Sequence, residues 1–515
     1  MRGSLYVLPS VLSHFRLEPL DTFPERRSVI CLVALGLSGC SIAAALETIA
    51  EAYSPSSQLC AGKQVFMQDG LVLSKEKVMT GKVSWAHLSM LRVKAGTLKA
   101  HKERFLSPGE RQRSSAMART APALTALQRR AAERSYPPVP AHCVVTGGSG
   151  FVGQRLVEML VERGAQRVVS FDILPQPPSA WQDSRIVYMQ GDLRRRVDVD
   201  RAVAGADCVW HVGAAVGPFH PSELYEEVNV GGCRHVVEAC LAAGVGKLVM
   251  SSSPSTRFDG SDIDGLTELE LPKLPQKSYL QEYAETKAKG ELVITQACCE
   301  KLLTVAIAPH QVYGPRDTLW TPNIMETAAT GKLRVFGNGR NRACFTYVDN
   351  YCHGLILGER ALKEGSPALG GFYICTDADT HPHSEGYAYL WEEVDRFAVG
   401  LGLPSVLEKF HLPQFLMYFL AYICNVVGFC LGRKLKLSPF SVKMLVMHRW
   451  FRPELAKKDL GYEPIIPFRE GWNDSIDWFK REWLPKYLDR QVASSYGVIH
   501  HGSQAKIDGQ SKKIE

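Results

Sequence analysis

Thr146-Gly147-Gly148-Ser149-Gly150-Phe151-Val152-Gly153 lies between two segments of different periodicity. The segment before it, His142–Thr146, is a short apolar and β-branched run, which is typical of a buried strand. The segment after it, Phe151–Arg163, repeats apolar residues at helical spacing. The sequence therefore predicts a strand, a glycine-rich turn and a helix in direct succession.

The glycines of this turn have the spacing of a phosphate-binding loop. Gly147 permits a tight turn, Gly150 lets a phosphate approach the backbone, and Gly153 lets the helix pack closely on the strand. The helix that begins with Phe151 and Val152 presents free N–H groups and the positive end of its dipole. A glycine cluster alone is often only a loop, but the strand before it and the helix after it favour a dinucleotide-binding site.

Strand-like runs and helical segments continue to alternate beyond the glycine turn. Near-continuous apolar strands that are joined by helices indicate a parallel sheet with both faces covered. The further strand predictions are Arg167–Asp172, Ile186–Gln190, Cys208–Val212, Lys247–Ser252 and Thr304–Ala308. The predicted fold class is therefore α/β, a Rossmann-type doubly wound parallel sheet followed by a smaller C-terminal substrate region.

Acidic and small residues follow the strands beside which an adenosine would bind. Asp172 ends the second strand, where its carboxylate accepts hydrogen bonds from ribose hydroxyls and repels the 2′-phosphate of NADP. Asp192 and Leu193 follow the third strand, near the expected adenine site, and Ala214 follows the fourth, where a small side chain leaves room. These positions predict NAD as the cofactor, although capping of the next turn is a second explanation for Asp172.

A tyrosine and a lysine share one predicted helix face in Tyr283-Ala284-Glu285-Thr286-Lys287. Tyrosine has a pKa of about 10, and a nearby ammonium lowers the pKa by favouring the phenolate. Tyr283 would then accept the proton of a substrate hydroxyl, and Lys287 would also bind the ribose of the cofactor. The pair by itself also occurs often by chance, as an exposed helix face without catalytic function.

A run of serines supports the catalytic interpretation of this pair. Ser253 follows the fifth predicted strand, at the carboxyl edge where ligands bind in such sheets, and would donate to the substrate oxygen. Asn229 would position a water or support a helix backbone, and an ordinary helix-start residue is an equal alternative. The predicted catalytic residues are Ser253, Tyr283 and Lys287, and no cysteine or histidine pair has the spacing of a metal site.

The order of these motifs resembles the extended short-chain dehydrogenases, and within them the 3β-hydroxysteroid dehydrogenase family. The resemblance includes TGGSGFVG, FDI, GDL, SSS, YAETK and PHQVYGPRD, runs through residues 141–350 and returns in residues 436–485. It implies that Tyr283 is the proton acceptor, Lys287 a cofactor ligand and Ser253 the partner of the hydroxyl. It also implies NAD-dependent oxidation of the 3β-hydroxyl of a 4α-carboxysterol with decarboxylation, in sterol biosynthesis.

The chain departs from the family pattern after the sixth predicted strand. The family often has Arg-Pro at this point, whereas this chain has Ala308-Pro309, so Pro309 remains a cofactor-binding candidate without the arginine. A carboxylate on the substrate needs a cationic or hydrogen-bonding partner, and Arg316 is a candidate. A structural salt bridge is the favoured alternative for Arg316.

Three other functions compete with this one. They are a 3β-hydroxysteroid dehydrogenase/isomerase, a nucleotide-sugar epimerase and a catalytically idle NAD-binding scaffold. A long apolar segment argues against the epimerase, because a sugar nucleotide needs no membrane docking. The complete set of Ser253, Tyr283 and Lys287 argues against the scaffold.

Phe415–Leu431 is apolar on all sides, which predicts a membrane-associated segment spanning residues 412–436. We expect this segment to enter one leaflet rather than cross the membrane, with a fully buried helix as the alternative. The basic residues at its end, which would reach lipid headgroups, are Arg433, Lys434 and Lys436. The chain ends in Lys512-Lys513-Ile514-Glu515, which has the form of a dilysine retrieval signal. Together these features predict the endoplasmic reticulum membrane, with the catalytic domain facing the cytosol.

The whole chain divides into four predicted regions. They are a targeting or disordered extension at 1–140, an NAD-binding domain with the catalytic residues at 141–310, a substrate-binding region at 311–485 and a polar tail at 486–515. The net charge of +7 is spread thinly and argues against nucleic acid as a partner. The expected partners are a sterol or steroid substrate, membrane lipid and a second copy in a homodimer. Most of the 14 cysteines lie in apolar runs, as expected for reduced core residues.

Overall fold

The computed structural model describes residues 60–61, 64–66, 72–74, 122–217, 220–430 and 437–495. The chain divides into two units, Met1–Phe105 and Leu106–Glu515. The described residues of the first unit form an antiparallel sheet of three short strands, β1 (Cys60–Ala61), β2 (Gln64–Phe66) and β3 (Val72–Ser74). The glycine turn and the predicted catalytic residues lie in the second unit.

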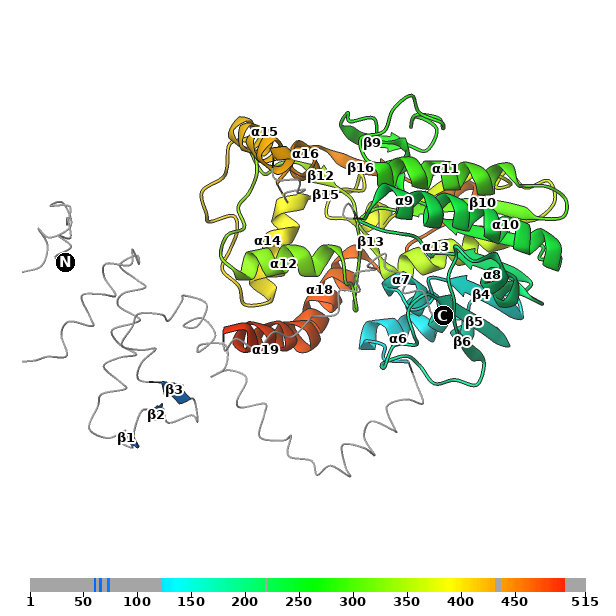
Figure 1. The fold of residues 1–515 in the computed structure, drawn as a ribbon, viewed down its shortest axis with the longest axis horizontal. Helices are drawn as coiled ribbons and strands as arrows, with labels where there is room; N and C mark the ends of the chain where they lie inside the picture. Colours follow the sequence, from blue (N-terminus) through cyan, green and yellow to red (C-terminus); the bar gives the residue numbers. More distant parts are fainter. Residues whose placement is uncertain are drawn as a thin grey trace, which may run out of the picture. The chain divides into compact units, whose positions relative to one another are not determined.

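A seven-stranded parallel sheet forms the centre of the second unit (Figure 1). Its strand order, β14-β10-β8-β7-β4-β5-β6, confirms the predicted Rossmann-type fold. The chain adds β5 and β6 on one side of β4 and then continues with β7 on the other side, so the strand order reverses between β4 and β7. All six predicted strands are present with bounds close to those expected. They are β4 (His142–Thr146), β5 (Arg167–Asp172), β6 (Ile186–Gln190), β7 (Cys208–His211), β8 (Lys247–Ser251) and β10 (Leu303–Pro309). The seventh strand, β14 (Phe372–Cys375), was not predicted.

Alternate residues of the central strands point into two cores, one on each face of the sheet. Val145 and Trp210 belong to the core that includes α7 (Phe151–Glu162) and α13 (Val348–Ala361). Their neighbours Val144 and Val209 belong to the core on the other face. The helices of that second core are α8 (Arg196–Val203), α10 (Gly232–Ala243) and α11 (Glu282–Gln296). Because both faces are covered, the interior positions of the central strands β4, β5, β7 and β8 are buried, in agreement with the near-continuous apolar runs of the sequence.

The large sheet continues beyond residue 310, where the NAD-binding domain was expected to end. Its last strand, β14, pairs in parallel with β10, from Ala306 opposite Phe372 to Pro309 opposite Cys375. Conversely, β9 (Ile263–Thr267) comes before residue 310 in the chain but does not belong to the large sheet. It pairs with β16 (Arg449–Arg452) of the C-terminal region. The boundary at 310 is therefore wrong as a division between two domains, because β14 is needed to cover the edge of β10.

A second sheet, in the order β15-β12-β16-β9, forms the centre of the C-terminal region. β16 (Arg449–Arg452) is parallel to β9 and to β12 (Arg342–Ala343), and β15 (Ala388–Tyr389) is antiparallel to β12. The helices of this region are α12 (Trp320–Ala329), α14 (Leu390–Gly400), α15 (Gln414–Cys430), α16 (Pro439–Val446), α17 (Glu454–Leu460), α18 (Phe468–Trp478) and α19 (Leu484–Ser495). The predicted substrate region is thus a folded α and β layer that is joined to the Rossmann half through β9.

Both outer boundaries also differ from the prediction. α6 (Ala126–Ala132) falls within the expected extension 1–140 but belongs to the fold, because Gln128 is buried and its Nε2 donates to Asp349 Oδ1 at 2.7 Å. At the other end, α19 continues into the expected tail, and the Tyr487 ring stacks on Trp483 with 5.0 Å between ring centroids. Residues 1–59 and 496–515 lie outside the described residues, and so does the C-terminal dilysine motif.

α15 corresponds to the predicted apolar segment, and most of it is exposed. The exposed fraction is 77% for Phe415, 62% for Phe419 and 88% for Phe429. Figure 1 shows α15 and α16 together, at the end of the unit opposite β4, β5 and β6. The alternative of a fully buried helix is therefore wrong. Within the described ranges, no helix is long and apolar enough to span a membrane, and the basic residues 433, 434 and 436 lie outside those ranges.

Candidate active site

The glycine turn has the backbone geometry that its sequence predicted. Gly147 has a φ of +70°, and a Cβ at this position would lie 2.7 Å from Gly213 Cα. A Cβ at Gly153 would lie 2.0 Å from the carbonyl oxygen of Gly147. Both positions therefore require glycine. Gly150 begins α7 without a side-chain cap, so this helix end is open to an anion, and the cradle fits the pyrophosphate of a dinucleotide.

Asp172 lies beside this turn at the end of β5. Its Oδ2 accepts a hydrogen bond from Ser149 N at 2.9 Å, and its Oδ1 accepts one from Leu174 N at 2.9 Å. Burial raises the pKa of the carboxyl, while these hydrogen bonds act in the opposite direction. Asp172 therefore does cap the following turn, and it also reaches the glycine loop where the adenosine ribose of a dinucleotide would lie.

The other predicted cofactor positions lie at the same edge of the sheet. The carboxylate of Asp192 is paired with Arg194 at 2.7 Å. Leu193 packs beside Gly213 and Gly232, where an added Cβ would lie 3.0 Å and 3.2 Å from the leucine side chain. The two remaining positions, which follow β7 and end β10, are Ala214 and Pro309. All four are placed at the carboxyl ends of strands, and their contacts with a cofactor stay predictions.

Replacing Asp172 with alanine is expected to narrow the preference for NAD over NADP. The substitution removes the repulsion of the 2′-phosphate and the hydrogen bonds to the ribose. We expect the ratio of kcat/KM values to fall by roughly tenfold, which corresponds to about 1.4 kcal/mol. Initial rates with both cofactors measure this ratio, with Asp183→Ala, outside the glycine loop, as the control. Equal kcat/KM for both cofactors in the unmodified enzyme would contradict the assignment.

The structure brings the three predicted catalytic residues together. Ser253 follows β8 and caps the short helix η5 (Pro254–Arg257), while Tyr283 and Lys287 lie one turn apart on α11. The Ser253 side chain lies close enough to the Tyr283 hydroxyl to lower its pKa, and Ser253 Oγ also lies 2.9 Å from Ser255 Oγ. Lys287 Nζ donates to the Ser251 carbonyl oxygen at 2.7 Å. The candidate active site therefore spans the end of β8 and the first two turns of α11.

The ionisation of Tyr283 differs from the sequence prediction. Burial raises the pKa of Tyr283 to about 12, the hydrogen bond from Ser253 lowers it, and the nearby Tyr225 raises it further. Burial also lowers the pKa of Lys287. The expected lowering of the tyrosine pKa by Lys287 is wrong for this structure, because desolvation of the phenol dominates and the ammonium is directed to the Ser251 carbonyl.

Asn229 is not an ordinary helix-start residue, and its side chain binds the backbone of the loop after β7 and a threonine side chain of α11. It lies in the π-helical segment η4 (Glu226–Gly231), where its Oδ1 accepts from Ala215 N at 2.8 Å and its Nδ2 donates to Thr286 Oγ1 at 3.3 Å. These contacts tie the loop after β7 to α11. Sequence reasoning missed Tyr225, whose ring centroid lies 6.2 Å from that of Tyr283 and which no local motif marks.

Arg316 is not available to a substrate carboxylate. Its Nη1 and Nη2 donate to the two carboxylate oxygens of Glu158 at 2.7 Å and 2.8 Å, and the pair is buried. Glu158 also lies 3.5 Å from Arg155, which pairs with Asp349 at 2.9 Å. The structural salt bridge is confirmed, so the expected role of Arg316 as the partner of a substrate carboxylate is wrong.

Arg449 is a cation that sequence reasoning did not single out. It begins β16, is partly exposed, and donates from Nη2 to the Gln311 amide oxygen at 3.1 Å in the orientation that satisfies both groups. Its Nη1 lies 3.0 Å from Met444 Sδ. Among the described residues, no carboxylate pairs with Arg449, and burial lowers its pKa to about 10. The guanidinium therefore retains capacity for an anion.

Register places Gln311, the contact of Arg449, beyond the carboxyl end of β10, the strand that pairs with β8. Ile307 of β10 lies opposite Ser251 of β8, so Pro309 is level with Ser253. Gln311 follows two residues later and contacts Arg449. The tertiary fold thus brings an arginine from β16 to the edge of the sheet that carries the hydroxyl partner of Tyr283.

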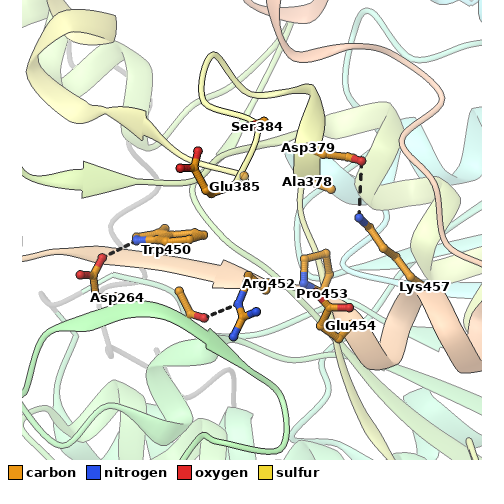
Figure 2. A pocket seen from close by; sticks show the side chains of 12 residues that line it. Asp264, Ala378, Asp379, Ser384, Glu385, Trp450, Arg452, Pro453, Glu454 and Lys457 are labelled. Carbon is orange, nitrogen blue, oxygen red and sulfur yellow. Dashed lines mark hydrogen bonds and ion pairs between the residues drawn. The ribbon is translucent and has the colours of Figure 1, made fainter.

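A separate pocket of about 540 Å³ lies in the C-terminal region (Figure 2). Trp450 and Arg452, which line it, are neighbours of Arg449 along β16, but Arg449 itself does not line it. Figure 2 shows Asp379 and Lys457 paired across one side of the pocket, with 3.6 Å between charged atoms. Its lining, all within the described part of the chain, includes none of the predicted catalytic or cofactor residues. This pocket is therefore distinct from the candidate active site.

The 3-beta hydroxysteroid dehydrogenase/isomerase family matches residues 144–399 of the chain. The chain is also 33% identical over 346 residues to the sterol-4-alpha-carboxylate 3-dehydrogenase, decarboxylating, of Mus musculus, covering 65% of this chain and 90% of that relative. The chain belongs to this family. Membership confirms the resemblance inferred from the motifs and makes the chain a member of a family of oxidoreductases that act on a CH–OH group.

Two further relatives have different names. The 3beta-hydroxysteroid-dehydrogenase/decarboxylase isoform 1 of Arabidopsis thaliana is 34% identical over 360 residues, which cover 65% of this chain and 79% of the relative. The 2-alkyl-3-oxoalkanoate reductase of Stenotrophomonas maltophilia is 33% identical over 331 residues, which cover 64% of this chain and 96% of the relative. Family membership alone therefore leaves the substrate open.

Solved structures show the same fold at lower identity. The epimerase Mth375 from Methanothermobacter thermautotrophicus aligns with a TM-score of 0.52 and 21% identity, covering 68% of this chain and 95% of that one. UDP-glucuronic acid 4-epimerase from Bacillus cereus, in complex with NAD, aligns with a TM-score of 0.50 and 21% identity, covering 66% and 98%. These likenesses support the Rossmann-type architecture and say nothing about the substrate.

Proposed function

We propose that the chain oxidises the 3β-hydroxyl of a 4α-carboxysterol with NAD and that the product loses carbon dioxide. The names of the relatives support this substrate class. In a 4-carboxylate that is oxidised at carbon 3, and in a 3-oxoalkanoate, the carbon that carries the oxygen is the β carbon of the carboxylic acid. The proposed substrate is therefore a β-hydroxy acid on a sterol frame.

The observation that carries this proposal is the position of Arg449. A substrate carboxylate must be held close to, but not at, the reacting hydroxyl. Arg449 has no carboxylate partner among the described residues, and its contact Gln311 follows the end of β10, the strand that pairs with β8 ahead of Ser253. A guanidinium can hold a carboxylate through two parallel hydrogen bonds, which fixes the substrate in orientation as well as in place.

The remaining site residues divide binding and proton transfer between them. Gly147, Gly150 and Gly153 would cradle the pyrophosphate of NAD, and Asp172 would hold its ribose. Bound NAD supplies the acceptor for the hydride. Tyr283 takes the proton of the hydroxyl, which Ser253 orients through its own hydrogen bond.

Decarboxylation needs no additional catalytic group in this scheme. Oxidation of the alcohol gives a β-keto acid, in which the ketone accepts the electron pair released with carbon dioxide. Arg449 would hold the carboxylate during the first step, and its partial exposure leaves a route for the product to depart. The competing 3β-hydroxysteroid dehydrogenase/isomerase activity would need no cation at this position.

Turnover of matched sterols with and without the 4α-carboxyl group tests the proposal. Purified enzyme and NAD are incubated with each sterol, and NADH and carbon dioxide are measured. We expect faster turnover of the carboxysterol, with carbon dioxide released in proportion to NADH. Faster turnover of the sterol without the carboxyl would overturn the proposal and favour a plain 3β-hydroxysteroid dehydrogenase.

We further propose that the enzyme works at the endoplasmic reticulum membrane, facing the cytosol, with α15 in one leaflet. Its exposed phenylalanines support this, since a sterol substrate resides in the bilayer. The 17 residues of α15 extend roughly 25 Å, less than the about 30 Å of a hydrocarbon core.

The triple variant Phe415→Ser/Phe419→Ser/Phe429→Ser is expected to lose at least tenfold in binding to phosphatidylcholine vesicles, because each exposed ring contributes about 1.5–3 kcal/mol when buried in lipid. Sedimentation with vesicles measures binding, and kcat in detergent should stay unchanged. Leu269→Ser, which changes a side chain that is 74% exposed elsewhere, is the matched control. Unchanged vesicle binding in the triple variant would contradict the proposal.

A further inference from the structure

Glu291 is a buried carboxylate on α11, one turn beyond Lys287, that the proposed reaction does not use. Its side chain is 2% exposed. Oε1 accepts from Arg257 Nη2 at 2.5 Å, and Oε2 accepts from Ser252 Oγ at 2.5 Å and from Arg257 Nη1 at 3.1 Å. The single carboxylate therefore engages several donors of one short segment.

That segment, 252–257, contains Ser253. Thr256 Oγ1 donates to the Ser253 carbonyl oxygen at 2.8 Å and also lies 3.4 Å from Glu291 Oε2. The Arg257 guanidinium lies 3.3 Å over the ring of Phe372, which anchors the segment on β14 as well. Glu291 therefore joins the serine segment to the helix that carries the tyrosine and the lysine.

Glu291 also acts on Lys287 through its charge. The two side chains are four residues apart on α11, and the carboxylate raises the pKa of Lys287 against the lowering by burial. The other titratable groups that face Lys287 are the Cys233 thiol of α10 and the His211 imidazole of β7. Burial raises the pKa of Cys233 to about 12 and lowers that of His211 to about 3, so both are neutral near pH 7.

We propose that Glu291 is a positioning residue that holds Ser253 in register with Tyr283 and keeps Lys287 charged. Arg257 is its counter-ion, with 2.5 Å between Arg257 Nη2 and Glu291 Oε1, and this pair holds the segment against α11. The inference rests on dehydrogenase chemistry and not on the 4α-carboxyl group, so it survives if the proposed substrate is wrong.

Two variants separate position from charge. Glu291→Asp keeps the charge but shortens the reach to segment 252–257, so we expect kcat to fall by roughly 10- to 100-fold with little change in KM for NAD. Glu291→Gln keeps the length but removes the charge. Lys287 should then lose its proton at lower pH, so the alkaline limb of the kcat/KM profile should move to lower pH. The assay uses the carboxysterol or, if that is not oxidised, the matched 3β-hydroxysterol.

Amide hydrogen exchange of the protein without cofactor gives a readout that does not depend on activity. In Glu291→Asp, peptides that cover segment 252–257 should exchange at least tenfold faster, while those that cover β4 stay unchanged. Ser252→Ala, which removes one of the contacts without unpairing Arg257, should give a smaller change of the same kind and serves if Glu291→Asp does not fold.

Glu359→Gln is the matched control, since Glu359 is a buried carboxylate that pairs with Lys247 at 2.6 Å, at the far end of the same strand, β8. It should lower stability without changing kcat or the alkaline limb. The proposal is overturned if both Glu291 variants keep kcat within about twofold and leave the limb in place, or if Glu359→Gln reproduces their effects.

Discussion

Replacing Tyr283 with phenylalanine should lower kcat by 10²- to 10⁴-fold, the loss expected for a general base. The substitution removes only the ionisable oxygen, so the ring should keep its packing against Tyr225. Binding of NAD, measured by titration, should stay within about twofold, because the glycine turn and Asp172 are untouched. Steady-state kinetics with the carboxysterol measure the loss.

The control for this substitution is Tyr373→Phe, which removes the hydroxyl of a buried tyrosine on β14 that contacts Asp459 at 3.0 Å. It should retain most of its kcat, because that hydroxyl faces no predicted site residue. If Tyr283→Phe keeps more than about a tenth of the unmodified kcat, Tyr283 is not the base. Its pKa of about 12 makes the pH profile informative, since activity should rise with pH through the neutral range.

Arg449→Met should lower kcat/KM for the 4α-carboxysterol by roughly 100-fold, as expected when one partner of a desolvated charge pair is removed. The thioether keeps much of the side chain's volume and removes its charge. The sterol without the carboxyl group should lose little, because it presents no anion to the guanidinium. Parallel kinetics with the two sterols measure the difference.

Arg452→Met provides the comparison, because Arg452 lies on the same strand and lines the separate pocket of Figure 2. Arg452→Met should leave kcat/KM for each sterol close to the value of the unmodified enzyme. An equal loss for both sterols in Arg449→Met would mean that Arg449 is structural. No loss of kcat/KM for either sterol would mean that Arg449 does not hold the substrate carboxylate, and the proposed substrate would lose its main support.

Local pattern was sufficient to predict six of the seven strands of the large sheet, all except β14. The central strands β4, β5, β7 and β8 are buried on both faces, so each is a short, mostly apolar run that can be recognised without tertiary information. The glycine turn was predictable for a similar reason, because backbone sterics at Gly147 and Gly153 leave no room for a side chain. Tyr283 and Lys287 were predictable because helical spacing alone places them together.

The remaining features depend on tertiary contacts. β12 and β15 have two residues each, too few for any periodicity to be visible. Arg449 differs from Arg316 only in what surrounds it, since one has no carboxylate partner among the described residues and the other is held by Glu158. The pKa of Tyr283 rises because of burial, which the Tyr-x-x-x-Lys spacing does not reveal.

β14 is the last strand of the large sheet in the sequence, and this position affects both folding during synthesis and the engineering of the enzyme. During synthesis, the edge of β10 has no neighbour until the chain through β12 and α13 has been added, so the nucleotide-binding half cannot close before much of the other half exists. The two halves are therefore not interchangeable modules. A graft that ended at residue 310 would leave a bare parallel edge, open to pairing with another chain. New substrate preferences are more readily obtained by changing residues on β16 and its neighbouring loops than by exchanging the half that carries them.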